Sequence, residues 1–406
     1  MTRARASRAA LVLLLTVVFV DIAGFGIVIP FLPFWAEHFG ASPAEVALLM
    51  SAYSLTQFIF APVLGRLSDR YGRKPVLLVS VFGSVLSFLW MAFAGSLWML
   101  FAARAVAGAM GANIAVANAG IADITPGEER ARGMGLVGMA FGLGFVLGPA
   151  IGALLAGPDI ATTGFRLPFL AGAGVSALAF AGGLVLLREP DRHRPGTVLP
   201  GGPLIRLRAF LALLASPGLG LPLLLLALLS LAMSGIESTF ALWAERQLLW
   251  GPRQTGLFLV WIGVCMAAVQ GGLVGPVVAR LGEVRTARLG TGVCAAGMAL
   301  APLALNIPVV LLSGFLIAAG LGLGQPALNA LLSRASAADI QGGVMGGAQS
   351  AQSLARIAGP ALAGLLFTAF DRQGPWISGA ILLLLGVALA TRLRDPGDQP
   401  GAATGS

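Results

Sequence analysis

Long apolar segments separated by short polar turns run along the chain from end to end. Continuous apolar runs of about 20 residues are typical of α-helices that cross a bilayer. Twelve such stretches can be delimited, at 9–34, 45–64, 75–95, 97–119, 133–156, 166–187, 218–242, 254–279, 286–305, 307–332, 342–369 and 375–391. The pattern predicts an all-α polytopic membrane protein with 12 transmembrane helices.

Lysine and arginine are distributed unevenly over the polar turns. With the N-terminus placed inside, the inside loops and tails hold twenty of the 26 basic residues and the outside loops hold four. Because basic residues accumulate in cytoplasmic loops, both termini are predicted to be cytoplasmic. Residues 1–20 imitate a signal peptide, but no small-x-small cleavage site follows, so we expect an uncleaved first helix. The near absence of lysine suggests a GC-rich bacterial genome, and hence the bacterial inner membrane.

Composition agrees with this interpretation. Hydrophobic residues make up 57% of the chain, charged residues 11%, and the mean hydropathy is +0.89. Soluble domains carry about 25% charged residues, so a soluble globule is excluded. The net charge of +9 is spread over alternate loops and forms no patch, which argues against a nucleic-acid partner.

Few residues suit catalysis or metal binding. His38 and His193 both lie in loops. The single lysine of the chain, Lys74, follows an arginine rather than a glycine, so the ATP-binding pattern G-x-x-x-x-G-K-[ST] cannot occur. Cys265 and Cys294 lie within spans without metal-ligand spacing, and we interpret them as small core residues. We therefore expect no enzymatic activity, no cofactor and no metal. The expected partners are a small-molecule substrate, protons and the lipid bilayer, and the chain is expected to be a monomer.

The chain contains an internal repeat. Paired motifs recur at a nearly constant offset of about 210 residues: Trp35-Ala36-Glu37 with Trp243-Ala244-Glu245, Arg70-x-Gly72 with Arg280-x-Gly282, Asn118-Ala119 with Asn329-Ala330, and Gly148-Pro149-Ala150 with Gly359-Pro360-Ala361. Parallel repeats of this kind are found in transporters. We predict a six-helix half at 9–187, a cytoplasmic linker at 188–217, a second half at 218–392 and a cytoplasmic tail at 393–406. Residues 204–214 are expected to form a short amphipathic helix on the inner leaflet.

The turn at residues 65–74 fits the pattern G-x-L-x-D-R-x-G-R-K at every defined position. It resembles the signature loop of the major facilitator superfamily (MFS), between its second and third transmembrane helices. Residues 61–78 and 122–130 are also similar to the twelve-helix drug:proton antiporter group, and to its tetracycline-exporter-like members in particular. The resemblance covers about 10–392 and implies the MFS fold, with 12 transmembrane helices as two six-helix halves.

The signature loop suggests a conformational latch. Asp69 ends the second helix, and the eleventh helix begins near Gln341, where free N–H groups and the helix dipole favour an anion. A charge contact there would favour the state closed to the cytoplasm. The alternative is that the basic residues of the loop only enforce the membrane topology. The residues assigned to the latch are Gly65, Asp69, Arg70, Gly72 and Arg73.

The fifth helix carries glycines at spacings that resemble the antiporter motif of the superfamily, with Ala153 in place of its last glycine. Glycines at these spacings allow close helix packing, here expected against the eighth or eleventh helix; any glycine-rich helix would share part of the pattern. The residues of this motif are Gly135, Gly144, Gly148, Pro149 and Gly152.

Three charged residues within spans are candidates for proton coupling: Asp21, Arg104 and Glu237. Charge inside a membrane is costly and needs a partner. Arg104 resembles the helix-four arginine that the superfamily uses in proton transfer, and Asp21 is its expected partner. A carboxyl group in an apolar span can exchange a proton near neutral pH. The alternative is a structural ion pair or a hydrogen-bonded structural acid.

Polar and aromatic residues within spans suit a sparse, mostly apolar substrate cavity, although each alone is equally suited to joining helices. The candidates are Phe25, Tyr53, Gln57, Asn113, Asn118, Gln270, Gln325 and Asn329. Tetracycline exporters typically place an acid, a histidine and an acid where this chain has Ser87, Met266 and Cys294. Tetracycline itself is therefore not the expected substrate.

The sequence predicts proton-coupled efflux of small, partly hydrophobic compounds by alternating access. One alternative is a proton symporter or uniporter that imports a small metabolite, and the antiporter-like motif in the fifth helix counts against it. A second alternative is a membrane sensor or scaffold on a transporter-like fold, and the intact signature loop and buried charges count against that.

Overall fold

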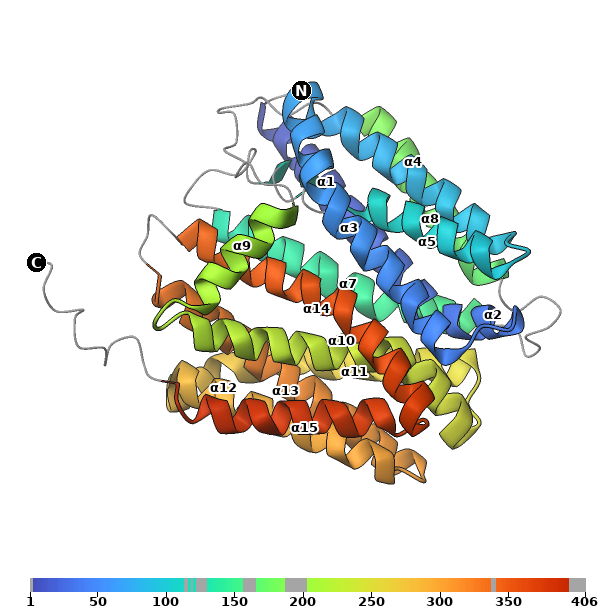
Figure 1. The fold of residues 1–406 in the computed structure, drawn as a ribbon. Coiled ribbons are helices and arrows are strands. Elements are labelled where there is room, and N and C mark those ends of the chain that lie inside the picture. Colours follow the sequence, from blue (N-terminus) through green and yellow to red (C-terminus); the bar gives the residue numbers. More distant parts are fainter. Residues whose placement is uncertain are drawn as a thin grey trace, which may run out of the picture. The chain divides into compact units, whose positions relative to one another are not determined.

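A computed structural model describes residues 3–112, 116, 117, 120, 121, 130–155, 166–186, 203–336 and 341–393. Within these ranges the backbone forms helices joined by short turns, without strands (Figure 1). The first half contains α1 (Arg3–Val28), α2 (Leu32–His38), α3 (Pro43–Tyr71), α4 (Arg73–Ala92), α5 (Leu97–Gly111), α7 (Arg130–Leu155) and α8 (Arg166–Leu186). The second contains α9 (Pro203–Leu214), α10 (Gly220–Leu248), α11 (Pro252–Ala268), α12 (Val274–Leu300), α13 (Ile307–Arg334), α14 (Gln341–Phe370) and α15 (Gly374–Ala390).

Each of the twelve predicted spans is mostly helix where the structure describes it, apart from the turn at 29–31 and a few residues at span ends. Eight continuous helical stretches are long and apolar enough to cross a bilayer, and one of them, Pro252–Leu303, contains two predicted spans. The bent pair α1–α2 and two shorter apolar helices, α5 and α15, account for the remaining spans. The described helices therefore agree with a twelve-helix membrane protein, and α9 matches the short helix predicted at the end of the linker. Asn113, Asn118, most of the linker and the tail from residue 394 lie outside the described residues.

The first span is bent rather than straight. α1 ends at Val28 and α2 begins at Leu32, with an angle of 44° between them. Pro30 lies between the two helices; it has no N–H to donate and disfavours helical geometry in the residue before it. The sequence predicted one span ending at residue 34, whereas helix continues after the bend to His38.

Two glycines turn the chain sharply at corresponding points of the repeat. Gly72, between α3 and α4, has φ 112°, and Gly282, within α12, has φ 75°. Residues with a Cβ atom rarely adopt such angles, so glycine is required at both turns. Gly282 divides α12 into two arms, which correspond to the end of one predicted span and to the next span.

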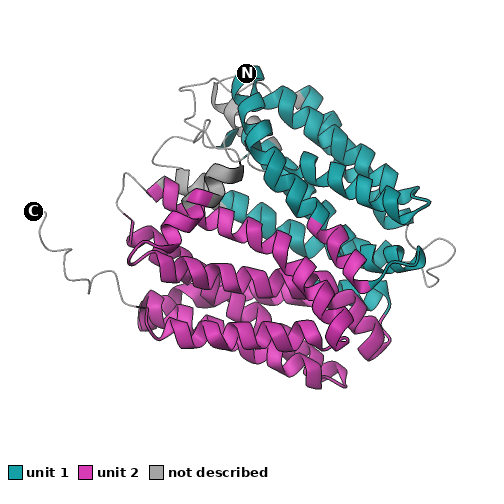
Figure 2. Cartoon of the chain, in the orientation of Figure 1, with its two compact units in different colours: residues 1–42, 52–202, 251–260 teal, residues 43–51, 203–250, 261–406 magenta. Residues whose placement is uncertain are grey.

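The chain separates into two compact units (Figure 2). Unit 1 comprises residues 1–42, 52–202 and 251–260, and unit 2 comprises residues 43–51, 203–250 and 261–406. α3 and α11 thus each contribute residues to both units.

The helix packing inside unit 1 recurs inside unit 2. In unit 1, α1 packs against α7 and α8, and α4 packs against α5 and α8. In unit 2, α10 packs against α14 and α15, and α12 packs against α13 and α15. The sequence repeat is therefore matched by a repeated pattern of helix–helix contacts in the two units.

Basic residues at the helix ends extend this parallel. Lys74 Nζ of α4 donates to the carbonyl oxygen of Leu184 near the end of α8, over 3.0 Å. Arg288 of α12 donates to three carbonyl oxygens at the end of α15, those of Ala390, Thr391 and Leu393. The last carbonyls of a helix have no partner within it, so a cation at this position stabilises the helix end.

Candidate functional site

Arg104 is the most deeply buried charged side chain among the described residues, with 1% of its surface exposed. It lies on α5, and its guanidinium carbon is 4.5 Å from the ring centroid of Tyr53 and 5.9 Å from that of Phe25. The two rings lie 5.3 Å apart. Aromatic faces attract a cation electrostatically, so the residues predicted as cavity aromatics hold the predicted coupling arginine.

Asp21 joins this group across a small cavity inside unit 1. The cavity measures about 20 Å³, which is room for about one water molecule. Asp21 and Arg104 both line it, so the structure brings together two of the three predicted coupling residues. The other lining residues are Gly24, Phe25, Val28, Tyr53, Ser84, Ser87, Phe88, Met91, Ala107 and Gly111.

Glycines allow α3 to approach α5 beside this cavity. An added Cβ at Gly108 would strike the carbonyl oxygen of Tyr53, and one at Gly111 would strike the Tyr53 hydroxyl. The Gln57 amide nitrogen donates to the carbonyl oxygen of Gly111 over 3.1 Å and lies 3.4 Å from the Tyr53 hydroxyl oxygen. Gln57, predicted as a cavity residue, thus joins α3 to α5 and fixes Tyr53 under Arg104.

Two serines of α4 are site residues that the sequence reading did not assign. Ser84 and Ser87 line the cavity with Asp21 and Arg104, and their hydroxyls donate to the carbonyl oxygens of Ser80 and Ser84. The spacing of three and four residues between the three serines places them on one helix face, which is a signal readable in the sequence. Ser87 is also the position where the resemblance to tetracycline exporters implied an acid, so this departure lies in the cavity that Asp21 and Arg104 line.

Glu237, the third predicted coupling residue, belongs to unit 2. It is half-buried on α10 and follows Gly235, whose carbonyl oxygen accepts hydrogen bonds from Ser238 and Thr239. It therefore lies outside the cavity that contains Asp21.

The predicted cavity residues of unit 2 lie on α13 and on the turn between α11 and α12. The Gln325 amide nitrogen donates to the Gln352 amide oxygen over 3.1 Å, joining α13 to α14. Asn329 is half-buried on α13. Gln270 is exposed on a π-helical turn, Val269–Leu273, between α11 and α12. Such turns interrupt the regular bonding of an α-helix and are frequent at functional sites.

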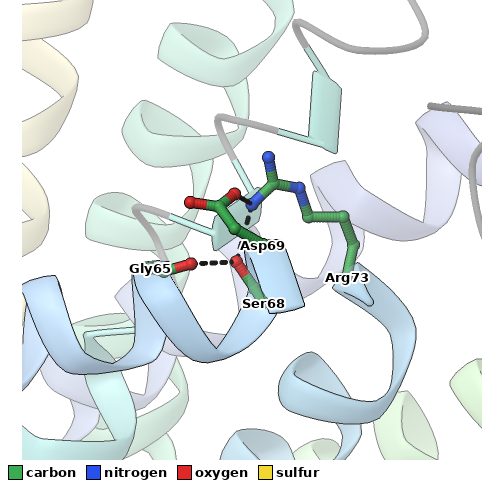
Figure 3. A network of polar contacts seen from close by, with 4 residues as sticks. All are labelled: Gly65, Ser68, Asp69 and Arg73. Carbon is green, nitrogen blue, oxygen red and sulfur yellow. Dashed lines mark hydrogen bonds and ion pairs between the residues drawn. The ribbon is translucent and has the colours of Figure 1, made fainter. Parts of the chain in front are cut away.

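The signature turn forms a compact polar network (Figure 3). Arg73 Nη1 lies 2.7 Å from Asp69 Oδ1 and donates to the Ser68 hydroxyl oxygen over 2.6 Å, and that hydroxyl donates to the carbonyl oxygen of Gly65. Arg70 lies over the ring of Tyr71. Because Arg73 is only 7% exposed, it fixes Asp69 across the turn between α3 and α4.

The corresponding turn of unit 2 carries a different ion pair. Glu283 follows Gly282 in the turn between the two arms of α12, and its Oε2 lies 2.7 Å from Arg334 Nη1 at the end of α13. The backbone N–H of Glu283 and the Arg334 guanidinium hold the pKa of this carboxyl below its usual value. The second turn therefore also carries a paired acid, which follows Gly282 whereas Asp69 precedes Gly72.

The glycines of the fifth helix pack against the first helix. An added Cβ at Gly144 would lie 2.9 Å from the Ile22 side chain, and one at Gly148 would strike the carbonyl oxygen of Ala23. One at Gly152 would lie 2.5 Å from the Phe31 ring. The expectation that these three glycines face the eighth or eleventh helix is wrong, because they seat α7 on α1.

The eighth helix meets the other residues of that motif. A Cβ atom added at Gly256 on α11 would lie 2.8 Å from the Cβ atom of Ala153 and 3.1 Å from the carbonyl oxygen of Pro149. In unit 2, Gly359 makes the same kind of approach to α10 that Gly148 makes to α1. The alanine in place of the last family glycine therefore lies at a real helix contact. Gly135 lies on α7.

We expect Gly148→Leu to lower the melting temperature of the purified protein. The new side chain would have to separate α7 from the backbone of α1, and overpacking of this kind costs about 1–3 kcal/mol. Gly138→Leu is the matched control, because it lies on the same helix with nothing within 4 Å of an added Cβ. Equal melting temperatures for the two variants would contradict the packing described.

Comparison with known proteins supports one family along the chain. A family model described as "Major Facilitator Superfamily" matches residues 14–346 and 223–405. The tetracycline resistance protein of class G from Vibrio anguillarum is 34% identical over 95% of this chain and 98% of its own length. The class C protein from Escherichia coli is 35% identical over 93% of this chain and 96% of its own length. Multidrug resistance protein 2 from Bacillus subtilis is 27% identical over 93% of each chain.

Solved structures agree in fold. A bacterial homologue of the human lysosomal transporter Spinster, in an inward-facing conformation, superposes with a TM-score of 0.78 at 15% identity. That match covers 96% of this chain and 97% of the other. The human organic anion transporter MFSD10 superposes with a TM-score of 0.70 at 24% identity, over 95% of this chain and 99% of its own.

Proposed function

Because the chain belongs to the major facilitator superfamily, whose members are transporters and not enzymes, we propose that it is a proton-coupled exporter. Its substrates would be small, partly hydrophobic compounds moved by alternating access. Drug resistance is what the names of its relatives state, and a membrane transporter gives resistance to a drug by moving it out of the cell. The protein would act as a monomer in the bacterial inner membrane.

The observation that carries the coupling part of this proposal is the buried arginine at the cavity that Asp21 also lines. Inserting a charged side chain at the centre of a membrane helix costs about 2.5–3.5 kcal/mol. A purely structural contact between helices rarely requires a charged residue. A carboxyl group beside a guanidinium can pass between charged and protonated forms as the cavity opens to either side. Asp21 would carry the proton, and Arg104 would hold the carboxylate once the proton leaves.

Substrate identity would differ from that of the tetracycline resistance proteins. At the positions where tetracycline exporters carry an acid, a histidine and an acid, this chain has Ser87, Met266 and Cys294. Ser87 lines the cavity beside Asp21, and Cys294 is buried where α12 meets Gly320 of α13. Neither a serine nor a buried cysteine replaces a carboxylate. We therefore propose that the substrates need no acidic contact in unit 1 besides Asp21.

Everted membrane vesicles provide the test. Vesicles holding the protein and an acidic interior are offered a panel of lipophilic cations, neutral drugs and tetracycline, with interior pH followed by a dye. Proton release on addition of a compound supports export. Accumulation of a compound by intact cells together with protons would favour import instead, and absence of any flux across the panel would favour a sensor or scaffold.

The signature turn is proposed to act as a latch for the state closed to the cytoplasm. Asp69→Asn should shift the resting population toward the inward-open state, because it removes the anion that Arg73 holds in place. Charges at helix ends contribute about 0.3–2 kcal/mol, so the shift should be partial. Cysteine pairs across the cytoplasmic gate should cross-link less often in this variant than in the wild type.

Arg66→Gln is the control for the latch, because Arg66 is exposed in the same stretch and, among the residues that the structure describes, donates to the carbonyl oxygen of Pro62 alone. It should leave cross-linking unchanged. If Asp69→Asn also leaves it unchanged at full expression, the basic turn serves topology alone.

Both termini are proposed to be cytoplasmic, from the twenty-to-four distribution of basic residues. A phosphatase reporter fused after Arg394 should be inactive, and a fluorescent reporter at the same place should be bright. An active phosphatase would place the C-terminus outside and overturn the topology.

A further inference from the structure

A groove on α12 combines two arginines with an apolar floor. It has a volume of about 530 Å³. Its lining residues recur at spacings of three and four and therefore lie on one face of the second arm of α12. They are Arg285, Arg288, Leu289, Gly292, Val293 and Ala296.

The groove has the length of one lipid leaflet. Eleven residues separate Arg285 from Ala296, which corresponds to roughly 16 Å along an α-helix. Half of a hydrocarbon core of about 30 Å is about 15 Å. The arginines lie where the second arm of α12 begins, beside the end of α15, so the apolar floor extends from the membrane surface to mid-membrane.

The charge at the surface end is fixed in place and open to a ligand. Arg288 Nε donates to the carbonyl oxygen of Ala390 over 2.8 Å, and its Nη2 donates to those of Thr391 and Leu393 over 3.0 and 2.9 Å. Its Nη1 group takes no part in these three bonds. Arg285 is exposed and forms no ion pair with any residue that the structure describes. An anion at this end would meet two guanidinium groups, which suit phosphate geometry.

Gly292 keeps the floor of the groove open. An added Cβ there would meet only the Val387 side chain, at 3.8 Å. The glycine therefore leaves a shallow depression in the surface of α12, with room for about one methyl group beside Val387 of α15. A flexible acyl chain can occupy such a space, whereas a water-soluble ligand would gain nothing from its apolar walls.

We propose that this groove binds an anionic phospholipid. The phosphate lies between Arg285 and Arg288, and one acyl chain lies along Leu289, Gly292, Val293 and Ala296. Basic pockets at the membrane surface bind anionic headgroups in this way. The bound lipid would stabilise the contact between α12 and α15, and this proposal does not depend on the substrate or on proton coupling.

The test uses the full-length protein, delipidated in detergent, with lipid binding counted by native mass spectrometry. The probes are dioleoyl phosphatidylglycerol, dioleoyl phosphatidylcholine and soluble glycerol phosphate. We expect the wild type to retain phosphatidylglycerol in preference to phosphatidylcholine, and glycerol phosphate not to displace it. Arg285→Gln should weaken binding about fivefold, since a basic residue near a membrane surface contributes about that factor.

Two further variants separate the headgroup contact from the groove. Arg280→Gln removes an exposed charge of the same arm-to-arm turn outside the groove, and it should leave binding unchanged. Gly292→Leu fills the floor, and it should abolish preferential retention without altering elution on size exclusion. If Gly292→Leu does not fold, Ala296→Leu replaces it at the exposed inner end of the groove.

Equal losses from Arg285→Gln and Arg280→Gln would reduce the effect to general surface charge and overturn the site. Displacement of the lipid by glycerol phosphate, or unchanged retention in the floor-filling variant, would overturn the acyl-chain contact. Equal retention of phosphatidylcholine would overturn the role of the arginines.

Discussion

Arg104→Ala is expected to reduce proton-driven transport to the level of membranes without the protein. Arg104 is buried, with its guanidinium over the rings of Tyr53 and Phe25, at the cavity that Asp21 lines. In the proposed mechanism Arg104 is the cation that balances the Asp21 carboxylate, and breaking a buried pair typically costs about 3–5 kcal/mol. Asp21 would then stay protonated and could not exchange its proton.

Arg104→Lys should rescue transport poorly. An ammonium lacks the flat surface that stacks on two aromatic rings and the fork that meets a carboxylate. Arg253→Ala is the control, because Arg253 is exposed at the start of α11 and its loss should leave transport intact. Transport and expression are measured together in everted vesicles; wild-type flux in Arg104→Ala at normal expression would exclude a coupling role.

Asp21→Asn and Glu237→Gln are expected to fail in different ways. Asp21→Asn keeps the shape of the side chain but removes the titrating group from the cavity. It should abolish transport driven by a pH gradient while substrate binding, and substrate exchange without a gradient, remain largely intact. Glu237 lies on α10 in the other unit, so Glu237→Gln should change substrate preference, chiefly by losing cations, while neutral compounds still move with protons.

These two variants are compared by counterflow, which needs no proton movement, and by uptake under an imposed pH gradient. The assignment is reversed if Asp21→Asn still releases protons on addition of substrate and Glu237→Gln does not. Loss of counterflow in Asp21→Asn would place this residue in substrate binding rather than in coupling.

The helices were predictable because apolar length and glycine position follow from the physics of the bilayer. A run of about 20 apolar residues has no stable alternative to helix in lipid, so the spans agree with the structure. Gly72 and Gly282 stand where the chain takes positive φ angles, and the constant offset between such motifs was visible without coordinates. The break at Pro30 was not predicted, because residues 9–34 were assigned to one continuous span, and neither was the continuation of helix α2 to His38.

The faces of the helices were less predictable. In a soluble helix the apolar stripe marks the buried side, but a membrane helix is apolar all round, so contacts must be inferred from small and polar residues alone. Gly148 was correctly identified as a close-packing position, yet its partner proved to be α1. Ser84 was not named, and Ser87 was named only as the position of an acid in tetracycline exporters, because serine in a membrane helix commonly bonds to its own backbone, as both do here.

The groove on α12 had no sequence signal of its own. Its apolar residues resemble those of any span, and Arg285 and Arg288 were counted only as evidence of topology. Their position beside the end of α15 depends on the turn at Gly282 and on packing between helices more than a hundred residues apart.

Proton movement through purified protein tests the central claim most directly. The wild type and Asp21→Asn are reconstituted in liposomes with a pH-sensitive dye inside, and a substrate found in the vesicle panel is applied as a gradient without any pH difference. We predict that substrate flow through the wild type drives protons the opposite way, and that Asp21→Asn exchanges substrate without moving protons. Substrate flow through the wild type without opposite proton movement, or undiminished proton movement through Asp21→Asn, would contradict it.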